Sequence, residues 1–194
     1  MCRRLGVGLH EKCQTQKFTL SEARKSKGAR GKRPKALSEF GKQLIEKQKV
    51  RFSYGITERQ LANSVDEASH AKHMAPALAL FSHLESRLDN VVYRLGIAHT
   101  RLLARQLVSH GHITVGGRKV TIPSFTVKKG DQISIREGSK KSSLFQDLPK
   151  KLKNYSQPEW LSFDAEKALA TVVGAPTAID QFFNLNSVFE FYSR

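Results

Sequence analysis

The sequence predicts an α+β fold in which amphipathic helices come first and a compact unit of two helices and three strands follows. Two observations support this prediction. Apolar residues recur at helical spacing through most of residues 37–110, and short segments that alternate apolar and polar residues begin directly after Gly111. With 194 residues, 39% of them hydrophobic, the chain is long enough for one ordinary domain or two small ones.

The helices of the first half are marked by the residues at their ends. Ser38 is a candidate N-cap for a helix that Gly55 can close, and Thr57 with Gln60 forms a candidate capping box for the next helix. Pro76 suits the first turn of a third helix. Each of these residues gives a local reason for a helix to begin or end there.

The apolar period that starts at Pro76 continues to Gly96, which is long for one helix, so we expect a break within residues 82–86. Thr100 is a candidate cap for a further helix, which Gly111 ends.

A β-hairpin follows that helix directly. The segment HITV leads into a Gly116-Gly117 turn, and RKVTI leaves it. Residues 132–136, QISIR, alternate as a last strand, which completes an α-α-β-β-β unit.

The charge of the chain favours a polyanionic partner. There are 33 Lys and Arg against 17 Asp and Glu, a net charge of +16. The excess is concentrated in residues 1–60, net +11, and continues through residues 61–150, net +6, whereas residues 151–194 carry −1. Charge alone favours nucleic acid over an anionic membrane. No apolar run is long enough to cross a bilayer, and the N-terminus has the charge but not the apolar region of a secretory signal.

The N-terminal residues lack a folding pattern of their own. Residues 21–35 are rich in Lys, Arg, Gly and Ser, so we expect an extended arm that orders against phosphates, or else a solvated tail. We expect Cys2 and Cys13 to be free thiols, because two cysteines provide neither the four ligands of a structural zinc site nor a disulfide framework. No cofactor is expected.

The predicted second helix and the hairpin place cations close together. Arg101 and Arg105 lie four residues apart on one helical face, and the turn should bring Arg118 and Lys119 near the end of that helix. These residues are either ordinary solvated cations or a basic face for the phosphates of folded RNA, and we favour the second interpretation. Histidines at positions 99, 110 and 112 flank this face.

Catalytic motifs are absent from the sequence. It has no phosphate-binding loop of the Walker type, no dinucleotide fingerprint and no G-x-S-x-G elbow. Asp89 and Asp131 look isolated, and the aromatic residues near the C-terminus are expected to be core. We therefore expect that the protein is not an enzyme.

Residues 85–136 resemble the RNA-binding module named after ribosomal small-subunit protein number four, in the segments ESRLDNVVYRLG, ARQLVSHGHITVGGRKVTIPS and KKGDQISIR. The module also occurs in pseudouridine synthases, some tyrosyl-tRNA synthetases and a heat-shock RNA-binding protein. Residues 37–61 are similar to the family segment LSxYGxQLxEKQKVRxxYGxxERQ, and PEWL and VFEFYSR resemble the family's ending. The chain is therefore identified as a member of the bacterial-type family of that protein.

The resemblance implies a division of the chain. A basic extended arm would occupy residues 1–36, and a mostly helical first lobe would occupy residues 37–84, completed by about 173–194. The RNA-binding module with its C-terminal extension would occupy residues 85–172. The sequence departs from the family at the start, where MCRRLG lacks the first cysteine of the relatives' CxxCRREG pattern, and at AKHMAPALA, which replaces a Gly-Asn-Thr-Gly loop.

The resemblance also implies a function. Members of the family are structural constituents of the small ribosomal subunit and primary binders of its ribosomal RNA, at a junction of several helices in the 5′ domain early in assembly. They lie near the mRNA entrance beside small-subunit proteins three and five and influence decoding accuracy. The expected location is a cytoplasmic ribosome, with an organellar one as alternative. The alternative functions are an RNA-modifying enzyme and a free RNA chaperone that carry the same module.

The residues expected to contact RNA come from the basic face and from the resemblance. They are Arg30, Lys32, Arg33, Lys42, Lys47, Lys49, Arg51, Tyr54, Arg59, Arg87, Asn90, Arg94, His99, Thr100, Arg101, Arg105, His110, His112, Arg118 and Lys119.

Overall fold

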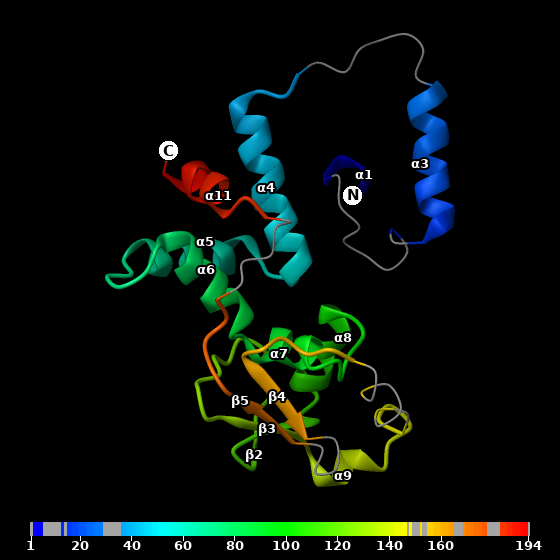
Figure 1. Cartoon of the computed structure of the whole chain (residues 1–194), viewed down its shortest axis with the longest axis vertical. Coiled ribbons are helices and arrows are strands. Elements are labelled where there is room, and N and C mark those ends of the chain that lie inside the picture. The colour runs from blue at the N-terminus through cyan, green and yellow to red at the C-terminus, as the bar shows by residue number, and fades with distance from the viewer. Residues whose placement is uncertain are drawn as a thin grey trace. The chain divides into compact units, whose positions relative to one another are not determined.

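The computed structural model describes residues 2–5, 13, 15–28, 36–146, 148, 152, 155–164, 169–177 and 183–193. The chain divides into two compact units (Figure 1). The first comprises Met1–Asp66 with Asp180–Arg194, and the second comprises Glu67–Ile179. The expected α+β class is confirmed, with helices in the first unit and helices with a sheet in the second. Among the described residues no helix combines the length and apolar character needed to span a membrane.

The first unit is built around helix α4, Glu39–Tyr54. The expected caps are present: the Ser38 hydroxyl accepts a hydrogen bond from the Gly41 amide at 3.2 Å, and Gly55 closes the helix with a φ of 63°. Helix α5, Glu58–Ser69, begins with the predicted capping box between Thr57 and Gln60.

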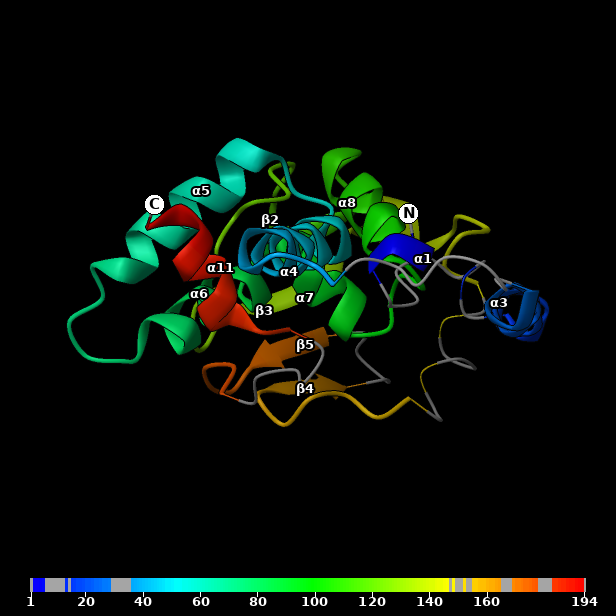
Figure 2. The same ribbon diagram turned by 90° about the horizontal axis from the view of Figure 1, so that it is seen from above.

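The C-terminal helix returns to the first unit. Helix α11, Leu185–Tyr192, packs along α4 and lies beside it in both views (Figures 1 and 2). Leu185 and Val188 of α11 are buried, as are Val50 of α4 and Leu61 of α5. The prediction that the helical lobe includes the end of the chain is therefore confirmed.

The N-terminal residues correct one expectation. Helix α1 spans Cys2–Leu5 and contacts α4, and helix α3 spans Gln16–Gly28. The extended arm predicted for residues 1–36 is therefore wrong for residues 2–5 and 16–28, which are helical. The reason is local, because Leu, Glu, Ala, Arg and Lys all have high helix propensity despite the lack of an apolar stripe.

The second unit begins with three helices: α6, Pro76–Glu85, α7, Leu88–Arg94, and α8, Arg101–Ser109. The break expected within residues 82–86 is confirmed, since α6 ends at Glu85. Helices α7 and α8 pack against each other, and their buried residues share one core with the sheet. A short helix, α9, spans Glu137–Lys140.

The sheet has five antiparallel strands in the order β2-β1-β3-β5-β4. The predicted hairpin is β1, Ile113–Val115, with β2, Arg118–Lys119, and the predicted last strand is β3, Gln132–Ile135. Two further strands, β4, Leu161–Asp164, and β5, Leu169–Val172, extend the sheet beyond the three predicted strands. These strands lie side by side in both views (Figures 1 and 2).

The division into units differs from the division expected from the sequence. The expected boundary was at residues 84/85, whereas the compact units divide at 66/67. Helix α6 causes the difference. Its residues Leu80 and Leu84 are fully buried, and α6 contacts α7 of the second unit.

Candidate nucleic-acid interface

Helix α8 is oriented by its apolar side. Thr100 caps it by accepting a hydrogen bond from the Leu103 amide at 3.2 Å. Ala104, Leu107 and Val108 are buried in the core, so Arg101 and Arg105 lie on a different face from them.

That face is half-buried rather than fully exposed, which corrects the expectation for Arg101 and Arg105. Their side chains are 18% and 35% exposed. The Arg101 guanidinium donates from Nε to Asn90 Oδ1 at 2.7 Å and lies 4.4 Å from the Tyr93 ring centre. Arg105 Nη1 lies 3.7 Å from Asp89 Oδ2. The sequence missed this because α7 packs directly beside α8.

The arginines at the two ends of α7 are held by two buried carboxylates. Arg87 donates to both oxygens of Asp89, at 3.1 and 2.8 Å, and both side chains are buried. Arg94 makes an equivalent two-point contact with Glu85, at 2.8 and 2.9 Å. Asn90 is buried and donates to Glu85 as well. Asp89 is therefore not isolated, and Arg87 and Asn90, which were expected to contact RNA, are buried in the fold.

The hairpin approaches the end of α8, as predicted. The Lys119 side chain crosses Gly111 so closely that a Cβ on Gly111 would lie 2.1 Å from the Lys119 Cε atom. Gly111 also has a φ of +73°, a conformation that side-chain-bearing residues rarely adopt. Arg118 and Lys119 are exposed, so the hairpin adds two solvent-accessible cations at the end of α8.

The three histidines differ in their surroundings. His99 and His110 are exposed. The His112 ring is half-buried; its Nδ1 atom is 2.9 Å from Ser139 Oγ, and the ring packs edge-on against Phe145. Among the residues that the structure describes, no group of three or more His, Cys, Asp and Glu side chains could hold a metal ion.

Lys128, Lys129 and Arg136 are also exposed, although the sequence analysis did not include them among the RNA-binding residues. Lys128 and Lys129 lie in the turn before β3, where the Asp131 carboxylate accepts a hydrogen bond from the Lys128 amide at 2.8 Å. Arg136 follows β3 and is also exposed. The KKGD turn was visible in the sequence, and its Asp is a common turn residue, so these lysines could have been included.

The first unit holds its predicted cations mainly in ion pairs. Lys42 pairs with Glu39 and Lys49 pairs with Glu46, each at 2.6 Å and one helical turn apart. Arg59 is exposed. Arg30, Lys32 and Arg33 lie outside the described residues.

Glu58 connects three helices of this unit. Lys47 Nζ lies 2.6 Å from it, Arg51 Nη1 lies 3.1 Å away, and the Tyr192 hydroxyl donates to it at 2.7 Å. Burial raises the pKa of Glu58, but the hydrogen bonds from Lys47, Tyr192 and Arg51 outweigh it and lower the pKa below 4.5. Burial and the hydrogen bond to Glu58 raise the pKa of Tyr192.

Two residues predicted to contact RNA lie inside the first unit. Lys47 is 6% exposed, with its ammonium 4.2 Å from the Phe191 ring centre, and Tyr54 is 4% exposed. Lys47 thus contacts α11, and the Tyr54 ring centre lies 5.9 Å from that of Phe183, just before α11, so the sequence pattern there reflects packing as well as charge.

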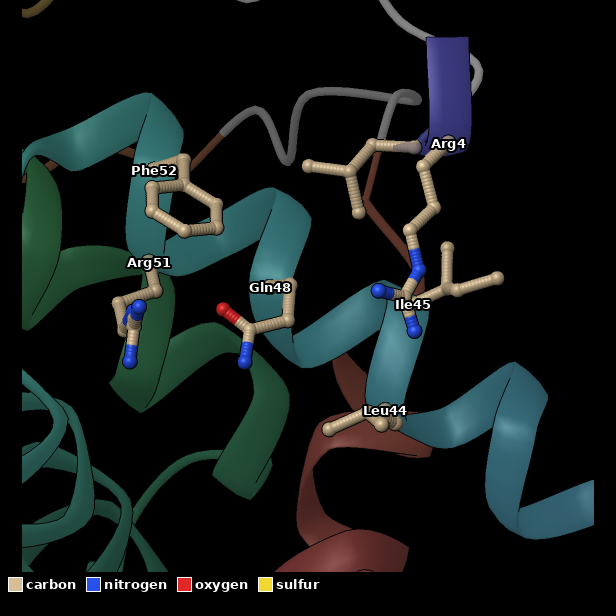
Figure 3. Close-up of a pocket in the computed structure, with 7 residues that line it drawn as sticks. Arg4, Leu44, Ile45, Gln48, Arg51 and Phe52 are labelled. Atoms are coloured by element: carbon tan, nitrogen blue, oxygen red, sulfur yellow. The ribbon is translucent and has the colours of Figure 1, made fainter. Parts of the chain in front are cut away.

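A pocket of about 320 Å³ lies beside α4 in the first unit (Figure 3). Its wall is mostly apolar, with two guanidinium groups among the lining side chains. Arg51 was expected to be functional, whereas Arg4 was not. The lining residues are Arg4, Leu5, Leu44, Ile45, Gln48, Arg51 and Phe52.

The two cysteines beside this region are not free thiols. Cys2 and Cys13 form a disulfide, with sulfur atoms 2.20 Å apart. The expectation from the sequence was therefore wrong. The Cα atoms of these two cysteines lie 6.5 Å apart, which is within the disulfide range, although the residues are 11 positions apart in the sequence.

Known proteins are similar to this chain over 99–100% of its length. Residues 1–85 match the family described as ribosomal protein S4/S9 N-terminal domain, and residues 86–133 match the S4 domain. The small ribosomal subunit protein uS4 of Chloroflexus aurantiacus is 44% identical over 196 residues, which cover 99% of this chain and 94% of that protein.

Two further relatives carry the same name. The protein from Halothermothrix orenii is 43% identical over 199 residues, and that from Thermus thermophilus is 42% identical over 200 residues. Each alignment covers 100% of this chain and 95% of the relative.

Proposed function

The chain belongs to the family of small ribosomal subunit protein uS4, and from this premise we propose that it binds the 5′ domain of small-subunit ribosomal RNA early in assembly. Membership makes it a structural, RNA-binding constituent of the small ribosomal subunit and not an enzyme. The binding site would be a junction of several RNA helices, as the family resemblance implies.

One observation carries the proposed mode of binding. Arg101 and Arg105 share a face of α8, and Lys119 reaches back over Gly111 at the end of the same helix. Rigid, spaced cations suit the sugar–phosphate backbone of folded RNA, whose narrow major groove excludes side chains from the bases. Binding should therefore depend on RNA shape and on phosphate contacts, and it should weaken steeply with salt.

The finer part of the proposal concerns the position within the ribosome. We place the protein near the mRNA entrance, beside small-subunit proteins three and five, where it influences decoding accuracy. The ribosome is taken to be cytoplasmic. The support for this part is the family membership, which extends over the full length of the chain.

We also propose that binding requires no zinc. Cys2 and Cys13 are bonded to each other, so their thiolates do not serve as metal ligands in this state. A chelator should leave the affinity for RNA unchanged, and a loss of affinity on chelation that zinc restores would contradict this.

Sedimentation tests the ribosomal role. Small subunits washed in high salt should retain the protein in a one-to-one ratio with their RNA. Recovery from the soluble fraction alone would contradict the role and favour a free RNA-binding protein. Crosslinking within washed subunits should then join Arg118 or Lys119 to the 5′ domain, and crosslinks confined to another domain would contradict the proposed site.

A further inference from the structure

Two buried carboxylates lie beneath the basic face of α8. Glu85, the last residue of α6, is 1% exposed, and Asp89 in the first turn of α7 is 3% exposed. Burial of a carboxylate is unfavourable unless charged and hydrogen-bonding partners surround it. Here the partners are four arginines, at positions 87, 94, 101 and 105, together with Asn90.

The network is layered. Its carboxylates are buried, whereas three of its arginine side chains are partly exposed: those of Arg94, Arg101 and Arg105 are 25%, 18% and 35% exposed. Among the residues that the structure describes, this network joins two carboxylates and four guanidiniums.

Glu85 reaches Arg101 in two ways. One Glu85 oxygen lies 3.8 Å from Arg101 Nη2. The other accepts from Asn90 Nδ2 at 3.0 Å, and Asn90 Oδ1 in turn accepts from Arg101 Nε at 2.7 Å. The Arg101 guanidinium is also stacked on Tyr93. An arginine side chain loses much rotamer freedom when it binds a ligand, and a guanidinium held in advance loses less.

We infer that Glu85 is a positioning residue for RNA: from within the fold it orients Arg101, directly and through Asn90, so that the guanidinium meets an RNA phosphate in a fixed geometry. This inference rests on the proposed function. The negative charge of Glu85 by itself repels RNA, whereas its positioning of Arg101 favours RNA binding.

Because these two effects change RNA affinity in opposite directions, a substitution that removes the charge of Glu85 distinguishes them. Glu85→Gln keeps the shape of the side chain and raises the net charge by one, so a purely electrostatic effect would strengthen RNA binding. If Glu85 positions Arg101, the affinity for a transcript of the 5′ domain should instead fall about tenfold, within the range known for residues that do not touch the ligand. The salt slope should also decrease, as expected when a phosphate contact is lost.

Glu137→Gln is the matched control. It makes the same charge change in the same unit, at a side chain that is 86% exposed and pairs with Lys140. Its affinity should equal that of the wild type or slightly exceed it.

A double-mutant cycle separates positioning from general destabilisation. In an Arg101→Ala background, Glu85→Gln should have little further effect, because the guanidinium that it orients is gone. Additive losses would overturn the inference, as would a Glu85→Gln protein that binds RNA as tightly as Glu137→Gln. If Arg101→Ala itself leaves binding unchanged, both the inference and the proposed role of α8 in RNA binding are wrong.

A second variant covers the case in which Glu85→Gln does not fold. Asn90→Ala removes the acceptor of Arg101 Nε without changing the charge. It should weaken binding in the same direction and couple to Arg101→Ala in the same way. An Asn90→Ala protein that folds and binds as tightly as the wild type would overturn the inference.

Discussion

Lys119 of β2 lies across Gly111, the residue that follows the C-cap of α8, with its Cε atom 2.1 Å from where a Gly111 β-carbon would be. The contact joins two elements whose cations were expected to act together. Two features explain why residue 111 is a glycine. Its φ is positive, and a side chain there would displace Lys119.

Gly111→Ala should therefore weaken RNA binding by moving Lys119, and it should also destabilise the fold by about 1–2 kcal/mol through the positive φ. Gly117→Ala is the matched control, since Gly117 has a φ of +78° and, its chain neighbours aside, no atom within 4 Å of where its β-carbon would lie. Both variants should lose similar stability in thermal unfolding, but Gly111→Ala should lose more affinity. Equal affinities would show that the Lys119 contact is irrelevant to binding.

Leu107 anchors α8 in the core of the second unit, where it is 4% exposed. Leu107→Ala should lower the free energy of unfolding by about 2–5 kcal/mol, as for other core leucines. Leu102→Ala on the same helix, at a side chain that is 63% exposed, should change it by less than about 0.5 kcal/mol. Denaturant unfolding measures both values. Similar losses would mean that α8 packs through a different face.

Glu58 should make the first unit sensitive to acid. Its pKa is lowered in the folded state, so its contribution to stability is complete above the ordinary value of 4.5 and is lost as the pH falls through the folded pKa. Because its side chain is 43% exposed, solvent screening limits the contribution to about 0.2–1 kcal/mol. Glu58→Gln should unfold at a lower temperature than the wild type at pH 7, and the difference should shrink at pH 3. A difference that does not depend on pH would contradict this account.

The sequence predicted the features that depend on neighbouring residues. The Ser38 and Thr100 caps and the hairpin turn at Gly116-Gly117 are all signalled within four residues of where they act, and all are present. The end of α6 at Glu85 was anticipated because a single amphipathic helix seldom runs so long.

Features that require distant residues to meet were missed. Arg101 and Arg105 reach Glu85 and Asp89 only when α8 packs on α7, and Arg101 is 16 residues from Glu85. Strands β4 and β5 extend the sheet through pairing with each other and with β3, which their short sequences do not signal. Likewise, Lys47 has the composition of a surface lysine and is buried because α11 returns from the far end of the chain.

The central claim, that α8 binds RNA phosphates through Arg101 and Arg105, can be tested with the protein in which both are changed to alanine. That protein should fold, because Glu85 keeps its two-point contact with Arg94 and Asp89 keeps that with Arg87. The control changes Lys140 and Lys141, which are exposed on and after α9 and were not predicted to bind RNA.

The measurement is the affinity of each protein for a 5′-domain transcript across a range of salt concentrations. We predict that the arginine variant binds more weakly than the wild type and that its salt slope is smaller by about two, one for each lost phosphate contact. The lysine control should keep the wild-type slope. A folded arginine variant with the wild-type slope would contradict the account, because the face of α8 would then make no phosphate contact.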